Sequence, residues 1–240
     1  MDTELASGKQ IIEALAKIGK AITSDLYLED ILKLIVTVTA EVMGSKICSL
    51  MLLNKSGKEL EIKATQSVSE NYNKKPNIKL GEGIAGRVAK YGKPITVLDV
   101  RKDERYINRE IAKKEKLCSL LSAPLIYKGS VMGVLNCYTA KPHRFNKNEI
   151  NILMSIANQA AVVIENFRLV VESEVIKEEL KTRKVIEKAK GILIRKGSLT
   201  EEAAYNLIRK YSMDNRKSMR EVSEAIILTE EMKKFLKNKT

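Results

Sequence analysis

Apolar residues recur at steps of three and four along the first forty positions of the chain. The first series comprises Ile11, Leu15, Ile18 and Ile22, and the second comprises Leu28, Ile31, Leu32 and Ile35. This spacing places the apolar side chains on one face of a helix. The pattern therefore predicts two amphipathic helices, of which Gly44 ends the second, because glycine is common just past a helix C-terminus.

Short apolar runs separated by turn residues follow these helices. Residues 47–53 and 60–64 flank a turn at 54–57, and residues 119–126 and 131–138 flank a turn at 128–130. Runs of this length around turn residues are typical of β-hairpins. Two hairpins are expected, and a glycine-rich passage at 80–89 and a charged helical segment ending at Lys116 lie between them.

A long helix without proline is expected from Asn146 onward. Its apolar positions are Ile150, Leu153, Ala157, Ala160, Ile164, Phe167 and Val171. Asn146 and Glu149 have the spacing of a helix start signal. A period close to 3.5 residues fits a coiled-coil seam and predicts a parallel homodimer. Alternatively, residues 150–160 pack on the protein's own sheet, and the dimer prediction then depends on the part after Ile164.

Three helical pieces are predicted in the last fifty-odd residues. The first contains Val185, Ile186, Ala189, Ile192 and Leu193 and ends at Gly197. The second begins near Thr200, and its stripe is Ala204, Leu207, Ile208 and Tyr211. The third begins at Ser218, which has capping-box spacing to Glu221, and carries Met219, Val222 and Ile226 on one face. Helices this short bury a core only by packing together or against the long helix.

Composition restricts the classes of protein and of site. The 240 residues, 44% apolar and 30% charged, suit two globular domains. No apolar run approaches the roughly 18 residues of a membrane span, and residues 1–4 are not the basic start of a signal peptide, so we expect a cytoplasmic protein without a membrane partner. Cys48, Cys118 and Cys137 have apolar surroundings and are expected to be reduced core thiols. His143 lies in a predicted loop, and no metal site or cofactor is expected.

Positive charge is concentrated toward the C-terminus. The chain has a net charge of +13, and residues 181–220 contain twelve basic and four acidic side chains. A basic cluster on a small helical bundle is typical of phosphate binding by nucleic-acid-binding proteins. A solvated helix surface is the alternative interpretation.

Residues 25–170 resemble a GAF domain. The resemblance lies in the passages at 80–94, with Asp99 after it, at 123–129 and at 133–136, which arrive in the order of that family. It implies a six-stranded antiparallel sheet with helices on one face and a small-molecule pocket on the other, used to sense a ligand or to dimerise. The sequence does not identify the ligand.

Residues 175–235 resemble an ANTAR domain, an RNA-binding antiterminator module. The passages at 185–193, 199–203, 209–217 and 219–226 carry the resemblance, and Ser212, Met219 and Ser223 depart from the usual residues. It implies a dimer that binds RNA hairpins with hexanucleotide loops in tandem. Transferred to this chain, it assigns RNA contacts to Lys188, Lys190, Arg209, Arg216, Lys217 and Arg220. Ala189, Gly191 and Ala203 would shape the RNA-binding surface or, alternatively, allow tight helix packing. Tyr211 is either a core residue or a platform for a base.

The predicted fold is α+β, an antiparallel-sheet GAF-like domain joined by a long coiled-coil helix to a three-helix all-α ANTAR-like domain. The expected boundaries are 1–170 for the sensor and dimerisation domain, 146–184 for the linking helix and 175–240 for the RNA-binding domain. The predicted function is antitermination by a dimer whose sensor domain responds to a small ligand or a partner, and no enzymatic activity is expected. Alternatives are a DNA-binding helix-turn-helix using residues 216–220, and a thiol-dependent reductase using the three cysteines.

Overall fold

The computed structural model describes residues 8–20, 27–67, 69–73 and 75–237, so Ile22 of the first predicted helix lies outside the described residues. The chain divides into two compact units, Met1–Arg168 and Leu169–Thr240. The first unit contains the sheet, and the second consists of helices.

The sheet of the first unit has six antiparallel strands, as the GAF resemblance implies. They are β1 (Ile47–Leu53), β2 (Glu59–Thr65), β3 (Ile78–Lys79), β4 (Ile95–Val97), β5 (Leu120–Tyr127) and β6 (Ser130–Tyr138). Their order is β3-β2-β1-β6-β5-β4. Both predicted hairpins form, as β1–β2 and β5–β6, and the pairing of Leu50 with Leu135 joins them at the centre of the sheet.

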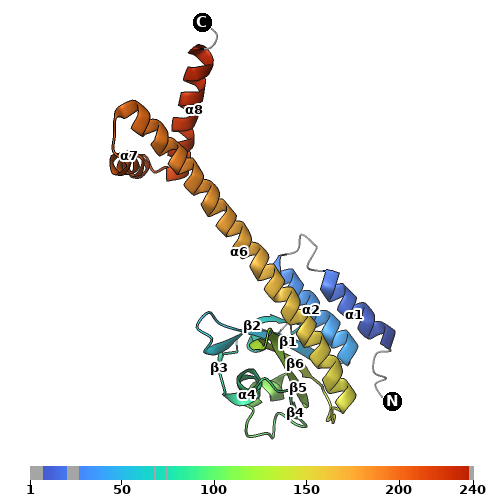
Figure 1. Cartoon of the computed structure of the whole chain (residues 1–240). Helices are drawn as coiled ribbons and strands as arrows, with labels where there is room; N and C mark the ends of the chain where they lie inside the picture. The colour runs from blue at the N-terminus through green and yellow to red at the C-terminus, as the bar shows by residue number, and fades with distance from the viewer. Residues whose placement is uncertain (1–7, 21–26, 68, 74, 238–240) are drawn as a thin grey trace. The chain divides into compact units, whose positions relative to one another are not determined.

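One face of the sheet is covered by α2 (Leu28–Met43) and the first part of α6 (Lys147–Gly197), and α1 (Gly8–Lys20) packs on α2 (Figure 1). Ile18, Ile35 and Leu153 are fully buried in the core that these helices form with the sheet. Gly44 ends α2 at φ 54°, a left-handed conformation that glycine adopts without steric cost.

The apolar positions predicted for α6 show whether residues 150–160 face a partner helix or the protein's own sheet. Leu153, Ala157, Ala160 and Ile164 are buried in the core of their own unit, with Ile150 and Phe167 partly buried beside them. The coiled-coil seam predicted for this part of the helix is therefore wrong, because the sheet already covers that face. The seam remains a prediction only for later positions, where Val171 is exposed.

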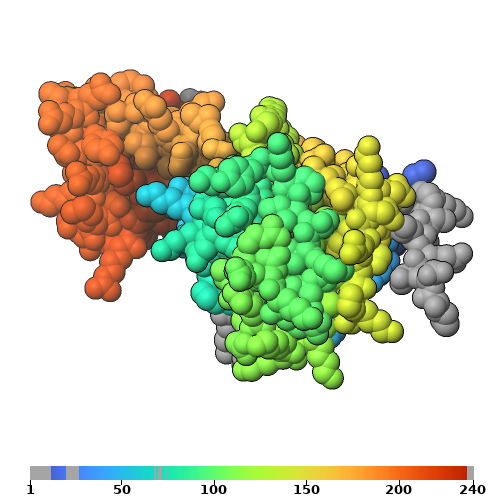
Figure 2. Space-filling model, turned by 90° about the horizontal axis from the view of Figure 1, so that it is seen from below, coloured from blue at the N-terminus to red at the C-terminus, as the bar shows by residue number. Residues whose placement is uncertain are grey.

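The opposite face also carries helices, which corrects the expectation of helices on one face. They are α3 (Glu70–Asn73), α4 (Gly83–Tyr91) and α5 (Arg109–Lys114), and the teal to green segment containing α4 and α5 forms much of the surface in Figure 2. A side chain at Gly86 would place its Cβ 2.3 Å from the Lys79 carbonyl oxygen. The glycine-rich passage thus serves close packing of α4 on the chain before it.

The pocket expected on this second face is almost filled. A cavity of about 20 Å³ lies there, whereas small-molecule sites typically have several hundred Å³. Tyr72, Tyr106 and Tyr138 occupy the space and are buried.

The second unit is a three-helix arrangement of the end of α6, α7 (Glu201–Asp214) and α8 (Met219–Lys237). Its core is Ala189, Ile208 and Val222. The first of the three predicted helical pieces is not separate, because α6 continues without a break for 51 residues to Gly197.

Among the described residues, α6 is the helix that is long and apolar enough to cross a membrane by length and composition alone. Its 18-residue window has a mean hydropathy of 1.2, and 44% of that window is buried inside the protein. Leu153 and Ala160 pack on the sheet, so the apolar character of this helix serves the core.

Candidate nucleic-acid interface

Local hydrogen bonds fix where the helices of the second unit begin. The Thr200 hydroxyl accepts a hydrogen bond from the Ala203 backbone N–H at 3.2 Å and caps α7. At the start of α8, the Ser218 N–H donates to the Glu221 carboxylate at 2.7 Å, and the Glu221 N–H donates to the Ser218 hydroxyl at 3.2 Å. This is the predicted capping box, which satisfies donors that a helix N-terminus otherwise leaves unpaired.

Three of the predicted RNA contacts project freely. Arg209, Arg216 and Lys217 are exposed, and none of the described carboxylates forms an ion pair with them. Arg216 lies in the turn after α7 with a φ of 52°. Their charges are therefore available to a phosphate backbone.

The other three predicted contacts are held by carboxylates of the same unit. Lys188 Nζ lies 2.9 Å from Glu231, and Arg220 lies 2.9 Å from Glu224 and 3.0 Å from Glu178. An RNA phosphate must compete with these carboxylates for the two cations. Exposed pairs of this kind contribute little to stability, so the competition is not costly.

Lys190 differs from the other cations because its side chain is only 8% exposed. Its Nζ donates hydrogen bonds to Glu201 at 2.8 Å and to Glu187 at 2.9 Å, which raise the pKa of Lys190. The hydrogen bond from Lys190 likewise lowers the pKa of Glu201. Lys190 thus joins α6 to the start of α7, and its charge is already balanced.

The three small residues lie in different environments. Ala189 is fully buried in the core of the unit, which is the helix-packing alternative. Gly191 and Ala203 are half-buried. A Cβ at Gly191 would meet only Arg195 Nη1 at 3.7 Å, an ordinary contact, so packing within the described protein does not require glycine there.

The apolar stripe predicted for α7 divides in two. Ala204 and Ile208 are buried, whereas Leu207 and Tyr211 are 49% and 54% exposed. These two side chains line a groove of about 470 Å³ between α6, α7 and α8, together with Lys217. Tyr211 is therefore not a core residue, and it is available to stack on a base.

The groove also contains two basic residues that are not among the predicted RNA contacts. They are Lys196 on α6 and Lys233 on α8. Lys196 forms an ion pair with Glu230. Only the tertiary packing of the three helices reveals this arrangement, since the residues are far apart in the sequence.

Family models match both units. Residues 26–165 match the GAF domain, and residues 174–227 match the ANTAR domain. The chain belongs to the GAF domain family and carries a C-terminal ANTAR domain. The α+β fold and the order of domains expected from the sequence are thus confirmed.

Relatives with established names match the two domains separately. The methyl sulfide methyltransferase-associated sensor of Methanosarcina acetivorans is 27% identical over 68% of this chain and 17% of its own length. The transcriptional regulatory protein PdtaR of Mycobacterium tuberculosis is 38% identical over 28% of this chain and 35% of its own length. This GAF–ANTAR chain therefore spans about a sixth to a third of the lengths of these relatives.

Solved GAF domains superimpose on the first unit. The GAF domain of a phosphoenolpyruvate-protein phosphotransferase from Coxiella burnetii has a TM-score of 0.61 and 25% identity, and the match covers 70% of this chain and 99% of that one. The free methionine-R-sulfoxide reductase of Neisseria meningitidis has a TM-score of 0.57 and 22% identity, and the match covers 69% and 95%. The second likeness shows the fold alone.

The cysteines of this GAF–ANTAR protein are free, buried thiols, as predicted. Cys48 and Cys137 face each other across β1 and β6 with their sulfur atoms 3.8 Å apart, and burial raises the pKa of Cys48. A thiol with a raised pKa is a poor nucleophile, since the thiolate is the reactive form. This environment does not favour the reductase alternative.

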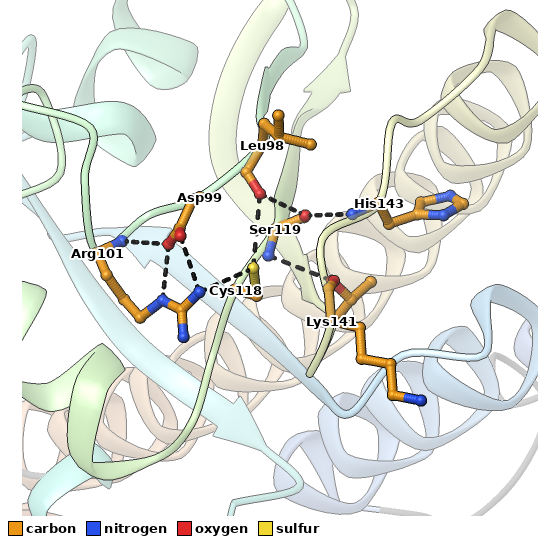
Figure 3. A network of polar contacts seen from close by, with 8 residues as sticks. Leu98, Asp99, Arg101, Cys118, Ser119, Lys141 and His143 are labelled. Atoms are coloured by element: carbon orange, nitrogen blue, oxygen red, sulfur yellow. Dashed lines mark hydrogen bonds and ion pairs between the residues drawn. The ribbon is translucent and has the colours of Figure 1, made fainter.

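Cys118 belongs to a polar network that connects the segment after β4 to the segment before β5 (Figure 3). Arg101 pairs with Asp99 at 2.7 Å, which lowers the pKa of Asp99, and also donates to the Cys118 sulfur at 3.3 Å. The Ser119 hydroxyl donates to the Leu98 carbonyl at 2.6 Å and accepts from the His143 N–H at 2.7 Å. These hydrogen bonds hold the segments at 98–101, 118–119 and 143 together, so the role of the network is structural.

His143 is the one histidine of the chain, and its ring lies beside the start of α6. Its Nε2 atom is 2.7 Å from the Glu149 carboxylate. Glu149 also accepts a hydrogen bond from the Asn146 N–H, and its own N–H donates to the Asn146 side chain. The predicted helix start signal is thus confirmed, and His143 supports it.

Proposed function

We propose that this GAF–ANTAR protein is a cytoplasmic regulator of transcription antitermination. Dimeric ANTAR domains bind tandem RNA hairpins with hexanucleotide loops, and the GAF domain responds to a small ligand or a partner. Support for the RNA-binding part comes from the ANTAR match and from the relative named as a transcriptional regulatory protein.

The observation that carries the proposal is a set of exposed cations without ion pairs, one of which lines the same groove as an exposed aromatic ring. Arg209, Arg216 and Lys217 have no described carboxylate partner, and Lys217 lines the same groove as Tyr211. Basic side chains hold the phosphate backbone, while an aromatic ring stacks on an unpaired base of a hairpin loop. This combination suits structured RNA with exposed loop bases.

The test is binding of the full chain to a two-hairpin RNA, to each hairpin alone and to a duplex DNA of equal charge over a salt series. We expect the two-hairpin RNA to bind most tightly, with an affinity that falls as salt rises. The double variant Arg216→Gln/Lys217→Gln should reduce the slope of log affinity against log salt by about two for two lost phosphate contacts. Lys55→Gln, in the exposed turn of the first hairpin, is the matched control and should leave the slope unchanged.

Binding to duplex DNA is the measurement that can contradict the proposal. Tighter binding of a palindromic duplex than of any RNA would overturn the proposal and favour the helix-turn-helix alternative, in which residues 216–220 enter a major groove.

A further inference from the structure

The last helix of the chain is longer than the segment that matches the ANTAR domain. The match ends at residue 227, whereas α8 continues without a break to Lys237. The core of the unit ends at the same point, because Ile227 is its last partly buried member and Leu228 and Met232 are exposed. Burial of apolar surface therefore does not explain the last turns of α8, residues 228–237.

This extension of α8 borders the groove of about 470 Å³ between α6, α7 and α8. Lys233 lines the groove from the extension, and Tyr211 and Lys217 line it from the part that matches the ANTAR domain. Lys217 lies just before α8, and Lys233 lies 14 residues after Met219, the first residue of the helix. At ~1.5 Å per residue, the two lysine positions are about 20 Å apart along the helix axis. The groove is thus longer than one base, whose stacked rise is about 3.4 Å.

The cations at the two ends of the groove are not balanced inside the protein. Glu230, which lines the groove from the extension, is already paired with Lys196. Glu221, the other carboxylate in the groove, is held in the capping box of α8. Among the described residues, neither Lys217 nor Lys233 forms an ion pair. Both ends of the groove are therefore open to an anionic partner.

Between these ends the groove is mainly apolar. Leu207 and Tyr211 are exposed in it, and Ile208 and Val222 line it from the core. Cations that hold phosphates, combined with an aromatic ring on which bases stack, are typical of single-stranded nucleic acid binding. An apolar helix of another protein would cover the same side chains but would bring no negative charge to the two lysines. The combination therefore favours an unpaired nucleic-acid strand.

We propose that this groove holds an unpaired strand of the RNA, with Lys233 binding a phosphate at one end and Lys217 binding a phosphate at the other. The proposal rests on the proposed RNA-binding function and extends its interface beyond the ANTAR match, onto the last turns of α8. The unpaired strand is either the hairpin loop or a single-stranded tail beside the stem, which have the same chemistry.

The phosphate contact of Lys233 is tested by RNA binding of the full chain over a salt series. One RNA is a hairpin without unpaired ends, and the other is the same hairpin with a single-stranded tail. Lys233→Gln should reduce the slope of log affinity against log salt by about 0.7, the value for one phosphate of a single strand. A decrease with both RNAs assigns the loop to the groove, and a decrease only with the tailed RNA assigns the tail.

Lys234→Gln is the matched control. It removes the same charge from the next residue of α8, which is exposed but does not line the groove, and it should leave the slope unchanged. An unchanged slope for Lys233→Gln with both RNAs, or an equal decrease for Lys234→Gln, would overturn the proposal.

A second variant tests the apolar part of the groove. Ala225 lines the groove and is exposed, so Ala225→Gln narrows the groove without adding charge, and glutamine is a good helix former. It should weaken RNA binding about tenfold, the effect of one lost stacked base, and leave the salt slope unchanged. An unchanged affinity would show that no base enters the groove and would contradict the proposal.

The same assays separate this proposal from the proposed function. If the wild-type chain bound neither RNA, the antitermination function would fail and the groove assignment with it. If the wild-type chain bound both RNAs while Lys233→Gln and Ala225→Gln had no effect, only the groove assignment would fail. Both substitutions are at exposed positions, and circular dichroism checks that the variants remain folded.

Discussion

Ser223 shows how a single hydroxyl can oppose the packing around it. Its side chain is fully buried on α8, and its Oγ atom has no hydrogen-bond partner among the described atoms. Ser212, the other serine at which this chain departs from the usual ANTAR residue, donates to the Lys217 carbonyl at 2.6 Å. Of these two serines, Ser223 is therefore the one whose hydroxyl is unsatisfied in the core.

Ser223→Ala should increase the free energy of unfolding by about 1 to 3 kcal/mol, the cost of an unsatisfied buried group. Chemical denaturation of the full chain measures it. Ser218→Ala in the same helix is the opposite control, because it removes a capping hydroxyl and should cost about 1 kcal/mol. A destabilised Ser223→Ala variant would mean that the hydroxyl has a bonding partner in solution.

Lys75 makes the stability of the first unit depend on pH in a direction that can be predicted. Its pKa falls from 10.5 to about 7 in the folded chain, so between these values the unfolded chain binds more protons and stability rises with pH. The slope for one group reaches at most about 1.4 kcal/mol per pH unit. The groups that face Lys75 are Tyr72, Tyr106, Tyr138 and Glu115. Burial raises the pKa of the tyrosines and of Cys48, which increasingly opposes the trend above about pH 8.5 as these groups ionise in the unfolded chain.

The corresponding measurement compares the denaturation midpoints of the wild-type chain and Lys75→Met from pH 7 to about 8.5. Their difference isolates Lys75, because both chains share all other groups. We expect the wild-type chain to gain stability relative to the variant as pH rises. Parallel curves would show that Lys75 titrates normally and is solvated.

At the scale of elements, periodicity predicted most of the helices and both hairpins because those signals are local. It could not decide what covers the α6 stripe, since a sheet and a partner helix require nearly the same spacing, and only the fold shows Leu153 and Ile164 against the sheet. The candidate site shows the same limit. Glu187, three residues before Lys190, is visible as a partner in the sequence, but Glu201 is brought to Lys190 only by the packing of α7.

A second apolar stripe on α6 carries the dimer prediction. Leu169, Ile176 and Leu180 are 46%, 49% and 53% exposed, and their seven- and four-residue steps are those of a two-helix seam. We expect a homodimer in solution and a monomer for Leu169→Gln/Ile176→Gln, because glutamine maintains the helix but removes the apolar contact. Light scattering after size exclusion measures the mass, and Lys177→Gln is the control that should stay dimeric. A dimeric double variant would place the interface elsewhere.

At the scale of the whole molecule, charge alone does not single out the RNA-binding unit. Residues 1–168 contain 26 basic and 18 acidic side chains, and residues 169–240 contain 17 and 12. Both units are thus positive. The difference lies in where the charges are placed, since Arg209, Arg216 and Lys217 belong to the ANTAR domain and Lys217 lines the groove that contains the exposed Tyr211. We therefore expect RNA affinity to depend on these few side chains more than on the net charge.

Dimerisation and RNA binding together predict a bivalent complex. A dimer presents two ANTAR domains, so the second hairpin of a tandem RNA binds at a high effective concentration, and the tandem affinity should exceed the single-hairpin affinity by about 10²- to 10⁴-fold. The monomeric variant Leu169→Gln/Ile176→Gln keeps Arg209, Arg216 and Lys217, so its affinity for one hairpin should equal that of the wild-type chain. Its affinity for the tandem RNA should no longer exceed its affinity for a single hairpin, as fluorescence anisotropy with labelled RNAs would show. If the monomeric variant retained the gain, the two hairpins would have to be read by one ANTAR domain, and the long helix would have no part in RNA selection.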